Sequence, residues 1–403
     1  MRFIRLLEAG ATPLSQFMVL VVASRGLASE DFSHFVLALS VGNLVTVAGL
    51  GMHITQQVEI PKQQPPQAWT YHAACRWLLV PIALALMLAC GGIGLALGTD
   101  RSWVYMLGVT YGLCLILDQV MAGGLRAFGA HDTVTRLDLG AKLCTIAGTA
   151  LFAPMGTAAC VGQLMVIQII SSAWKARRLR DFKPPQPGMA QPMATVWQQV
   201  KHIALSSKGP LLQQAGAQMF SSADKVVMGA MGATNLLGIY AILQQTSAAI
   251  QIIPAQFLQP TIAQVAGSSD RPERTRRLLQ SAATCVAMIT LLATALYTLH
   301  APVFQLFFGL NGLQPDEHKA LVTMILVYAL ISAQTPFIYF LQGVGATIEV
   351  GMTWISSGIL ALALMTVLAP TATSLSDFVE LRAAFGIGLI PLLWLTLKKM
   401  NRD

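Results

Sequence analysis

The sequence predicts an all-α integral membrane protein. Its twelve transmembrane helices would form two six-helix lobes related by a pseudo-two-fold axis along the membrane normal. Of the 403 residues, 55% are hydrophobic and only 11% are charged, whereas soluble proteins carry about 25% charged residues. Apolar spans recur along the whole chain, and a proline-rich segment divides them six and six.

Each apolar span is about as long as a helix that crosses a bilayer, which needs about 20 residues. The first has a basic start like that of a signal peptide, but Glu8 interrupts it, so we interpret it as an uncleaved helix. The twelve expected spans cover residues 7–24, 33–54, 73–97, 103–125, 133–153, 156–174, 203–230, 237–263, 278–299, 319–342, 346–369 and 377–397.

The segment between the sixth and seventh spans is expected to separate two domains. Residues 184–200 are rich in proline, which favours a stiff, extended linker. We therefore predict an N-terminal lobe over residues 1–183 and a C-terminal lobe over residues 201–403.

The two halves also resemble each other. Residues 26–35 lead into the second span much as residues 230–239 lead into the eighth. Both are small-residue turns, with Asp31 or Asn235 where a helix cap would stand. Six spans bring the chain back to the same side, so the two repeats would be parallel.

Lysine and arginine are distributed unevenly among the connecting loops. With the N-terminus in the cytoplasm, the inner loops receive most of them, including the run 175–180 and the C-terminal tail. The positive-inside rule therefore places both termini in the cytoplasm. The formal charge of +8 then reflects topology and not nucleic-acid binding. The run 175–180 either stops transfer or binds anionic lipid head groups.

Charged residues inside apolar spans cost about 2.5–3.5 kcal/mol each, so they usually face a bundle interior or a water-filled cavity. Asp138 and Lys142 are four residues apart, and form either a structural ion pair or part of a transport path. Asp224 and Lys225 are adjacent and point to different faces, so at least one meets another helix or water. A functional role and a pairing between lobes both remain open for Asp224.

Five basic residues are candidate contacts for an anionic substrate. Lys208 precedes a Gly-Pro kink, and either extends to the inner face or contacts a pyrophosphate or an acidic sugar. Arg25 and Arg382, near the outer side, have the same two interpretations. Lys142 and Lys225 complete the set.

Other polar residues within the spans suggest ion coupling and sugar binding. Asp118, in the fourth span, lacks an obvious partner, and a carboxylate in such surroundings can carry a proton. Asp118 and Asp224, one per lobe, are the candidate ion-coupling residues. The seventh and eighth spans are rich in glutamine, with Gln218 and Gln245 as candidate sugar contacts. Hydrogen bonding between helices is the alternative for these amides.

Several classes of function are not indicated by the sequence. The six cysteines lie singly in apolar spans and the seven histidines lack metal-ligand spacing, so we expect no disulfide, metal site or cofactor. There is no DxD motif or Walker-type phosphate loop, and the longest outer loop is short. An enzyme such as a membrane-bound polysaccharide polymerase or glycosyltransferase is therefore not expected.

Short motifs along the chain match one transporter family. They occupy residues 25–32, 49–51, 124–129, 224–232, 238–240 and 302–309. These residues resemble the turns and signature segments of polysaccharide flippases, the O-antigen flippase-like group. That group belongs to the MOP exporter superfamily, which also holds the MATE drug antiporters and the lipid II flippases. The chain departs from the family at Ala48, where aspartate is usual.

The resemblance implies a two-lobed transporter of the bacterial inner membrane. It would move a lipid-linked oligosaccharide, a polysaccharide precursor, from the inner to the outer leaflet by alternating access, with the sugars in a central cationic cavity. It implies coupling to H⁺ or Na⁺, and membrane lipids, a polysaccharide polymerase and glycosyltransferases as partners. A drug antiporter of the same fold is the alternative, although the basic charges within the spans favour an anionic substrate.

Overall fold

The structure is a computed structural model of the chain. It describes the backbone of residues 2–97, 99–182, 198–203, 207–268, 270–372 and 374–402. Side chains are described over these ranges except at residues 2–10, 90–97, 99–101, 210, 263, 369 and 401–402. All the regular secondary structure of the described residues is helical, as the apolar spans predict.

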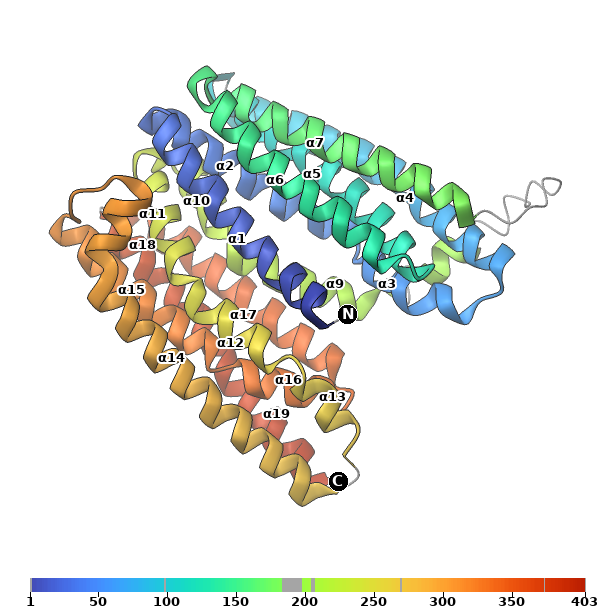
Figure 1. Ribbon diagram of the computed structural model, residues 1–403. Helices are drawn as coiled ribbons and strands as arrows, with labels where there is room; N and C mark the ends of the chain where they lie inside the picture. Colours follow the sequence, from blue (N-terminus) through green and yellow to red (C-terminus); the bar gives the residue numbers. More distant parts are fainter. Residues whose placement is uncertain are drawn as a thin grey trace. The chain divides into compact units, whose positions relative to one another are not determined.

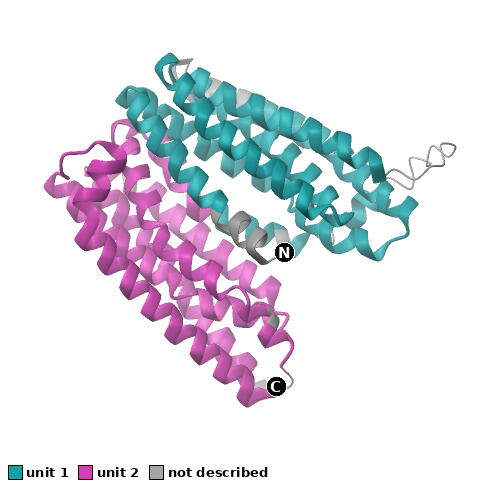
Figure 2. Cartoon of the chain, in the orientation of Figure 1, with its two compact units in different colours: residues 1–218 teal, residues 219–403 magenta. Residues whose placement is uncertain are grey.

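The chain divides into two compact units, Met1–Gln218 and Met219–Asp403 (Figure 2). The second unit begins after Gln218, whereas the sequence led us to expect a second lobe from residue 201. Residues 184–197, which make up most of the expected linker 184–200, lie outside the described residues, as does the side chain of Glu8. The lobe boundaries at residues 183 and 201 therefore stay predictions.

Unit 1 is a bundle of long helices in which α5 is central. This helix packs against α2, α3, α4 and α7, while α1 packs against α6 (Figure 1). The helices of unit 1 are α1 (Arg2–Gly26), α2 (Ser29–Val45), α3 (Met52–Glu59), α4 (Pro65–Leu97), α5 (Thr99–Ala127), α6 (His131–Phe152), α7 (Thr157–Leu179) and α9 (Lys208–Gln218).

Small residues allow α5 to approach α2 closely. Gly108 and Gly112 are one turn apart on α5 and meet Gly42 of α2. A Cβ on Gly112 would lie 2.6 Å from the Gly42 carbonyl oxygen, and one on Gly108 would lie 2.7 Å from the Ala38 oxygen. Since lipid provides no hydrophobic drive for helices to associate, such close backbone contact is a main source of packing energy between them.

Unit 2 contains one helix that is much longer than the others and several that are interrupted. A π-helical turn, Met219–Ala223, precedes α10, and a 3₁₀ segment, Ala383–Gly388, follows α18. The helices of unit 2 are α10 (Asp224–Ala230), α11 (Thr234–Ser247), α12 (Ala249–Leu258), α13 (Thr261–Ala266), α14 (Arg271–Phe308), α15 (Pro315–Ser332), α16 (Thr335–Gly343), α17 (Thr347–Leu368), α18 (Leu375–Arg382) and α19 (Leu389–Arg402).

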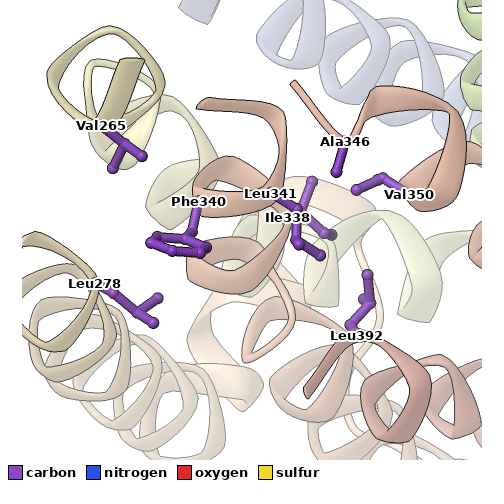
Figure 3. Packing of buried hydrophobic residues seen from close by; sticks show 8 residues of the cluster. All are labelled: Val265, Leu278, Ile338, Phe340, Leu341, Ala346, Val350 and Leu392. Carbon is purple, nitrogen blue, oxygen red and sulfur yellow. The ribbon is translucent and has the colours of Figure 1, made fainter. Parts of the chain in front are cut away.

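One end of unit 2 is organised around α16. Its buried Ile338, Phe340 and Leu341 join apolar side chains of α13, α14, α17 and α19 in one cluster (Figure 3). Gly343 lies against α13 so closely that a Cβ there would be 2.8 Å from the Val265 Cβ. The cluster therefore holds the C-terminal helix α19 to the rest of the unit.

The outer surfaces of both units are apolar, as expected for a protein surrounded by lipid. In the most apolar stretch of α14 only 6% of residues are buried, and in that of α4 only 17%. Large side chains such as Leu88 and Leu291 are exposed there. In water such a surface would be an interaction site or cause aggregation. The chain is thus a multi-pass membrane protein.

In the part of the chain that the structure describes, fewer helical segments meet the length and hydropathy of a membrane span than the sequence predicts. Within the described residues, nine helical segments are long and apolar enough to cross a membrane. The expected spans 7–24, 133–153 and 203–230 are not among the nine, although α1, α6, α9 and α10 lie in them. Twelve transmembrane helices and a symmetry between two lobes therefore stay predictions.

We expected Asp31 to cap its own helix, but it does not. It lies in the first turn of α2, where Ala28 is the N-cap residue. Its Oδ1 instead accepts hydrogen bonds from the hydroxyl (2.8 Å) and the backbone N–H (3.4 Å) of Thr157, at the start of α7. In unit 2, Asp316 of α15 accepts from Leu375 N–H (2.9 Å) and the Ser376 hydroxyl (2.7 Å) at the start of α18. Each carboxylate thus satisfies backbone donors that a helix leaves unpaired at its N-terminus.

Candidate functional site

The main polar cluster of unit 2 is built around Arg382, the last residue of α18. Its side chain is fully buried, and its Nη1 forms an ion pair with Oδ2 of Asp224, which is 2% exposed. Asp224 is the first residue of α10 and also accepts a hydrogen bond from the Tyr240 hydroxyl at 2.5 Å. Arg382 thereby ties α10, α11 and α18 together through a buried charge pair.

The remaining surface of the Arg382 guanidinium is covered by carbonyl and aromatic groups. Its Nη2 donates to the Phe220 carbonyl at 2.7 Å and to the Tyr328 hydroxyl at 3.1 Å. The guanidinium carbon lies 4.4 Å from the ring centroid of Phe220, with the rings of Tyr328 and Phe385 at 5.3 and 5.9 Å. An arginine stacked in this way gains cation–π attraction that a lysine would not reproduce.

Lys225 is the second basic group of this cluster and has mainly uncharged partners. Its Nζ donates to the Ser221 carbonyl and to Oε1 of Gln244, a buried residue of α11. Among the described residues, its nearest carboxylate oxygen is Asp224 Oδ1, 4.0 Å away, and Asp224 is already paired with Arg382. The cluster therefore contains two basic side chains for one carboxylate.

The π-helical turn Met219–Ala223 explains why backbone carbonyls are available here. A π-turn widens the helix by one residue, which redirects nearby carbonyl groups away from the regular i→i+4 pattern. The Phe220 carbonyl accepts from Arg382, while the Ser221 carbonyl accepts from Lys225 and from Gln244 Nε2 at 3.1 Å. Such turns are frequent at functional sites.

Unit 1 has a polar cluster of a different composition. Lys175 of α7 is fully buried. Its Nζ lies 2.6 Å from Oδ2 of Asp118 on α5 and 2.5 Å from Oδ1 of Asp138 on α6. Arg126 of α5 also contacts Asp138, at 3.2 Å, and the Ser172 hydroxyl donates to Asp118 at 3.4 Å. This cluster has two carboxylates for two basic groups, and it joins three helices.

Two expectations about unit 1 are wrong. Asp118 does not lack a partner, because α7 continues beyond the expected end of the sixth span and brings Lys175 beside it. Asp138 and Lys142 do not pair with each other either: Asp138 faces Arg126 and Lys175, whereas Lys142 Nζ donates to the Thr12 hydroxyl of α1 at 2.7 Å. The competing partners come from neighbouring helices, which a spacing rule for a single helix does not include.

The other candidate residues occupy different positions along their helices. Arg25 is exposed in the last turn of α1, and Lys208 is exposed at the start of α9. Gln218 and Gln245 are half-buried, at the end of α9 and within α11. Of the residues selected from the sequence, the structure brings together Asp224, Lys225 and Arg382 in unit 2.

Sequence reasoning missed several members of the two clusters. The sequence placed Lys175 in a basic loop, and it assigned no role to the side chains of Tyr240, Tyr328 and Phe220. Gln244, not its neighbour Gln245, contacts Lys225. Tyrosine in an apolar span does carry a signal, since a buried hydroxyl usually needs a partner.

The chain has the fold of a known class of membrane transporter. Over 99% of its length it matches 98% of a multidrug resistance MATE family transporter of the MOP superfamily, with a TM-score of 0.74 and 14% identity. The lipid II flippase MurJ matches with the same TM-score and 12% identity, over 97% of this chain and 87% of MurJ.

A third structure with this fold is an MOP superfamily transporter from Pyrococcus furiosus whose binding pocket is described as reversed in polarity. It matches all of this chain and 98% of its own, with a TM-score of 0.54 and 13% identity. No protein-family model and no curated protein sequence matches the chain. These likenesses define the fold, and the three solved structures that share it are two transporters and a flippase.

Proposed function

We propose that the protein is an MOP-superfamily transporter of the O-antigen flippase-like group. It moves a lipid-linked oligosaccharide from the cytoplasmic to the outer leaflet of a bacterial inner membrane by alternating access. The fold it shares with MurJ, a lipid II flippase, supports a lipid-linked substrate. In this proposal membrane lipids surround the protein, and polysaccharide polymerase and glycosyltransferases act on the same substrate.

The observation that carries the proposal is the excess of basic groups in the unit 2 cluster. Asp224 is paired with Arg382, while Lys225 is held by a carbonyl and an amide oxygen. An anionic oxygen would add to these hydrogen bonds a Coulomb attraction for the ammonium group that a carbonyl or amide oxygen does not give. A pyrophosphate or an acidic sugar is therefore a better ligand for Lys225 than a cationic drug.

The remaining candidate residues act as accessory contacts in this proposal. Arg25, Lys142 and Lys208 supply further positive charge along the substrate path. Gln218 and Gln245 bind sugar hydroxyls, for which amides offer both donors and acceptors.

The second candidate function is export of small molecules, because the MATE transporter matches as well as MurJ does. Proteoliposomes containing the purified protein distinguish the two. We expect a fluorescent lipid-linked oligosaccharide to be flipped and a monovalent cationic dye not to be transported. Transport of the dye without flipping of the lipid would contradict the proposal and favour the multidrug function.

We propose Asp118 and Asp224 as the groups that couple transport to H⁺ or Na⁺. A coupling ion shifts an equilibrium only if it binds two conformations differently, and each carboxylate can change basic partners when helices move.

The test of this proposal compares two proteins. Because Asp224→Asn alone would leave Arg382 without its ion pair, the first carries the double substitution Asp224→Asn with Arg382→Gln, and the second carries Asp118→Asn. We expect flipping by either to be independent of an imposed gradient. A response to the gradient equal to that of the wild type in both would place coupling elsewhere.

A further inference from the structure

Unit 1 has a groove on its apolar surface that neither polar cluster uses. It lies between α4, α5 and α7 and has a volume of about 660 Å³. Pockets of about 300–1,000 Å³ are typical of those that hold drug-sized ligands. Most of its lining is aliphatic, with Arg76 and Trp77 of α4 as the main exceptions.

The groove is suited to a hydrocarbon chain. Val80 of α4 and Ile169 of α7 line it and are each 51% exposed, so it opens on the side of α4 that faces lipid. The one hydroxyl in the lining, that of Thr110, already donates to the Met106 carbonyl of its own helix at 2.9 Å. The walls therefore leave no hydroxyl that an apolar occupant would deprive of a partner.

The length of the groove corresponds to one leaflet. Along α4 it extends from Ala73 to Ala83, which is about 15 Å at a rise of 1.5 Å per residue. The hydrocarbon core of a bilayer is about 30 Å thick. An acyl chain that enters at one interface would end near the other limit of the groove, at the bilayer midplane.

One end of the groove has the features of a membrane interface. Trp77 is 67% exposed. Trp174 of α7, 61% exposed, comes two residues after Ser172. The Ser172 hydroxyl contacts Asp118, which follows Leu117 of the groove lining on α5. Tryptophans concentrate at the level of the lipid head groups. Arg76 is exposed beside Trp77, and within the described part of the chain it makes no hydrogen bond or ion pair.

We propose that this groove binds one acyl chain of an anionic phospholipid, with the lipid phosphate at Arg76. The guanidinium matches a phosphate group in charge and hydrogen-bonding geometry. The lipid belongs to the leaflet at the N-terminal end of α4, which is the cytoplasmic one in the predicted orientation. Anionic lipids of that leaflet attract basic residues near the membrane surface.

Native mass spectrometry of the full chain, released from nanodiscs of equal parts phosphatidylglycerol and phosphatidylcholine, tests the site. We expect the wild type to retain phosphatidylglycerol preferentially and Arg76→Gln to lower this preference about fivefold. The matched control is Arg177→Gln, which removes an exposed arginine in the last turn of α7, outside the groove. It should leave the preference unchanged.

A second variant tests the groove without changing charge. Ala83→Trp fills the end away from Arg76 and should reduce retention of the lipid while Arg76 is intact. Equal retention by the wild type and both groove variants would overturn the proposal, as would an equal loss in Arg177→Gln. In nanodiscs that also contain a polyprenyl phosphate, retention of that lipid in place of phosphatidylglycerol would overturn it too, since the groove would then hold the carrier of the transported sugar.

Discussion

The two units solve the same problem, a buried charge in a membrane protein, in different ways. In unit 1, Lys175 and Arg126 face Asp118 and Asp138, so positive and negative groups are equal in number. In unit 2, Arg382 and Lys225 share one carboxylate, and aromatic rings and backbone carbonyls supply the other contacts. A balanced cluster mainly holds helices together, whereas an unbalanced one can still bind a ligand of opposite charge.

The position of each cluster along its helices also differs. Lys175 is near the C-terminal end of α7, whereas Arg382, the last residue of the short α18, lies in the first third of the apolar segment Leu375–Met400. In the predicted topology both helices run from the outer to the inner side. The unit 1 cluster would then lie near the cytoplasmic surface and the unit 2 cluster nearer the outer one.

The largest expected effect comes from the balanced cluster. Lys175→Met leaves two carboxylates without their shared partner, and breaking a buried pair costs about 3–5 kcal/mol. We expect a large loss of thermal stability in detergent, measured by the unfolding temperature. Arg178→Gln is the control, because its partner Asp181 is 3.9 Å away and both are exposed, so it should cost about 0–1 kcal/mol. Similar stability of the two variants would contradict the role of Lys175.

A somewhat smaller effect is expected from Arg382→Gln in unit 2. Asp224 loses its ion pair but keeps the Tyr240 hydroxyl and has Lys225 at 4.0 Å. Combining this change with Asp224→Asn should restore part of the lost stability, since the double variant leaves neither charge unpaired. Additive losses in the double-mutant cycle would show that the two side chains do not interact.

Helix packing in unit 1 gives a more modest prediction. Gly112→Ala places a Cβ 2.6 Å from the Gly42 carbonyl of α2, and overpacking of this kind costs about 1–3 kcal/mol. Gly140→Ala in α6 is the control, because no atom lies within 4 Å of its added Cβ. It should be neutral or stabilising by up to about 1 kcal/mol. A neutral Gly112→Ala would mean that α2 and α5 are less closely packed than described.

The sequence predicted the class of fold well, because apolar length and the scarcity of charge are properties of single segments. It also selected Asp224, Lys225 and Arg382, since each is a charge inside an apolar span. It failed for Asp138 and Lys142, whose contacts are with α5, α7 and α1 and not along α6. Partners on other helices depend on how helices are rotated and packed, which no periodicity along one helix specifies.

The end of α7 illustrates a second limit. The basic run after residue 174 looks like the start of a loop, but the helix continues to Leu179 and buries Lys175. A buried lysine is compatible with the interior only because two carboxylates meet it there. The effect of those partners cannot be read from the run itself.

The central claim is that Lys225, the basic side chain of the unit 2 cluster that is not paired with Asp224, binds an anionic substrate. Lys225→Gln tests it most directly, because the amide can still donate to the Ser221 carbonyl, so the fold should keep its unfolding temperature. We predict that flipping of a fluorescent lipid-linked oligosaccharide in proteoliposomes falls about tenfold or more, as expected for loss of one charge-assisted contact. Flipping at the wild-type rate by a stable Lys225→Gln protein would contradict the account.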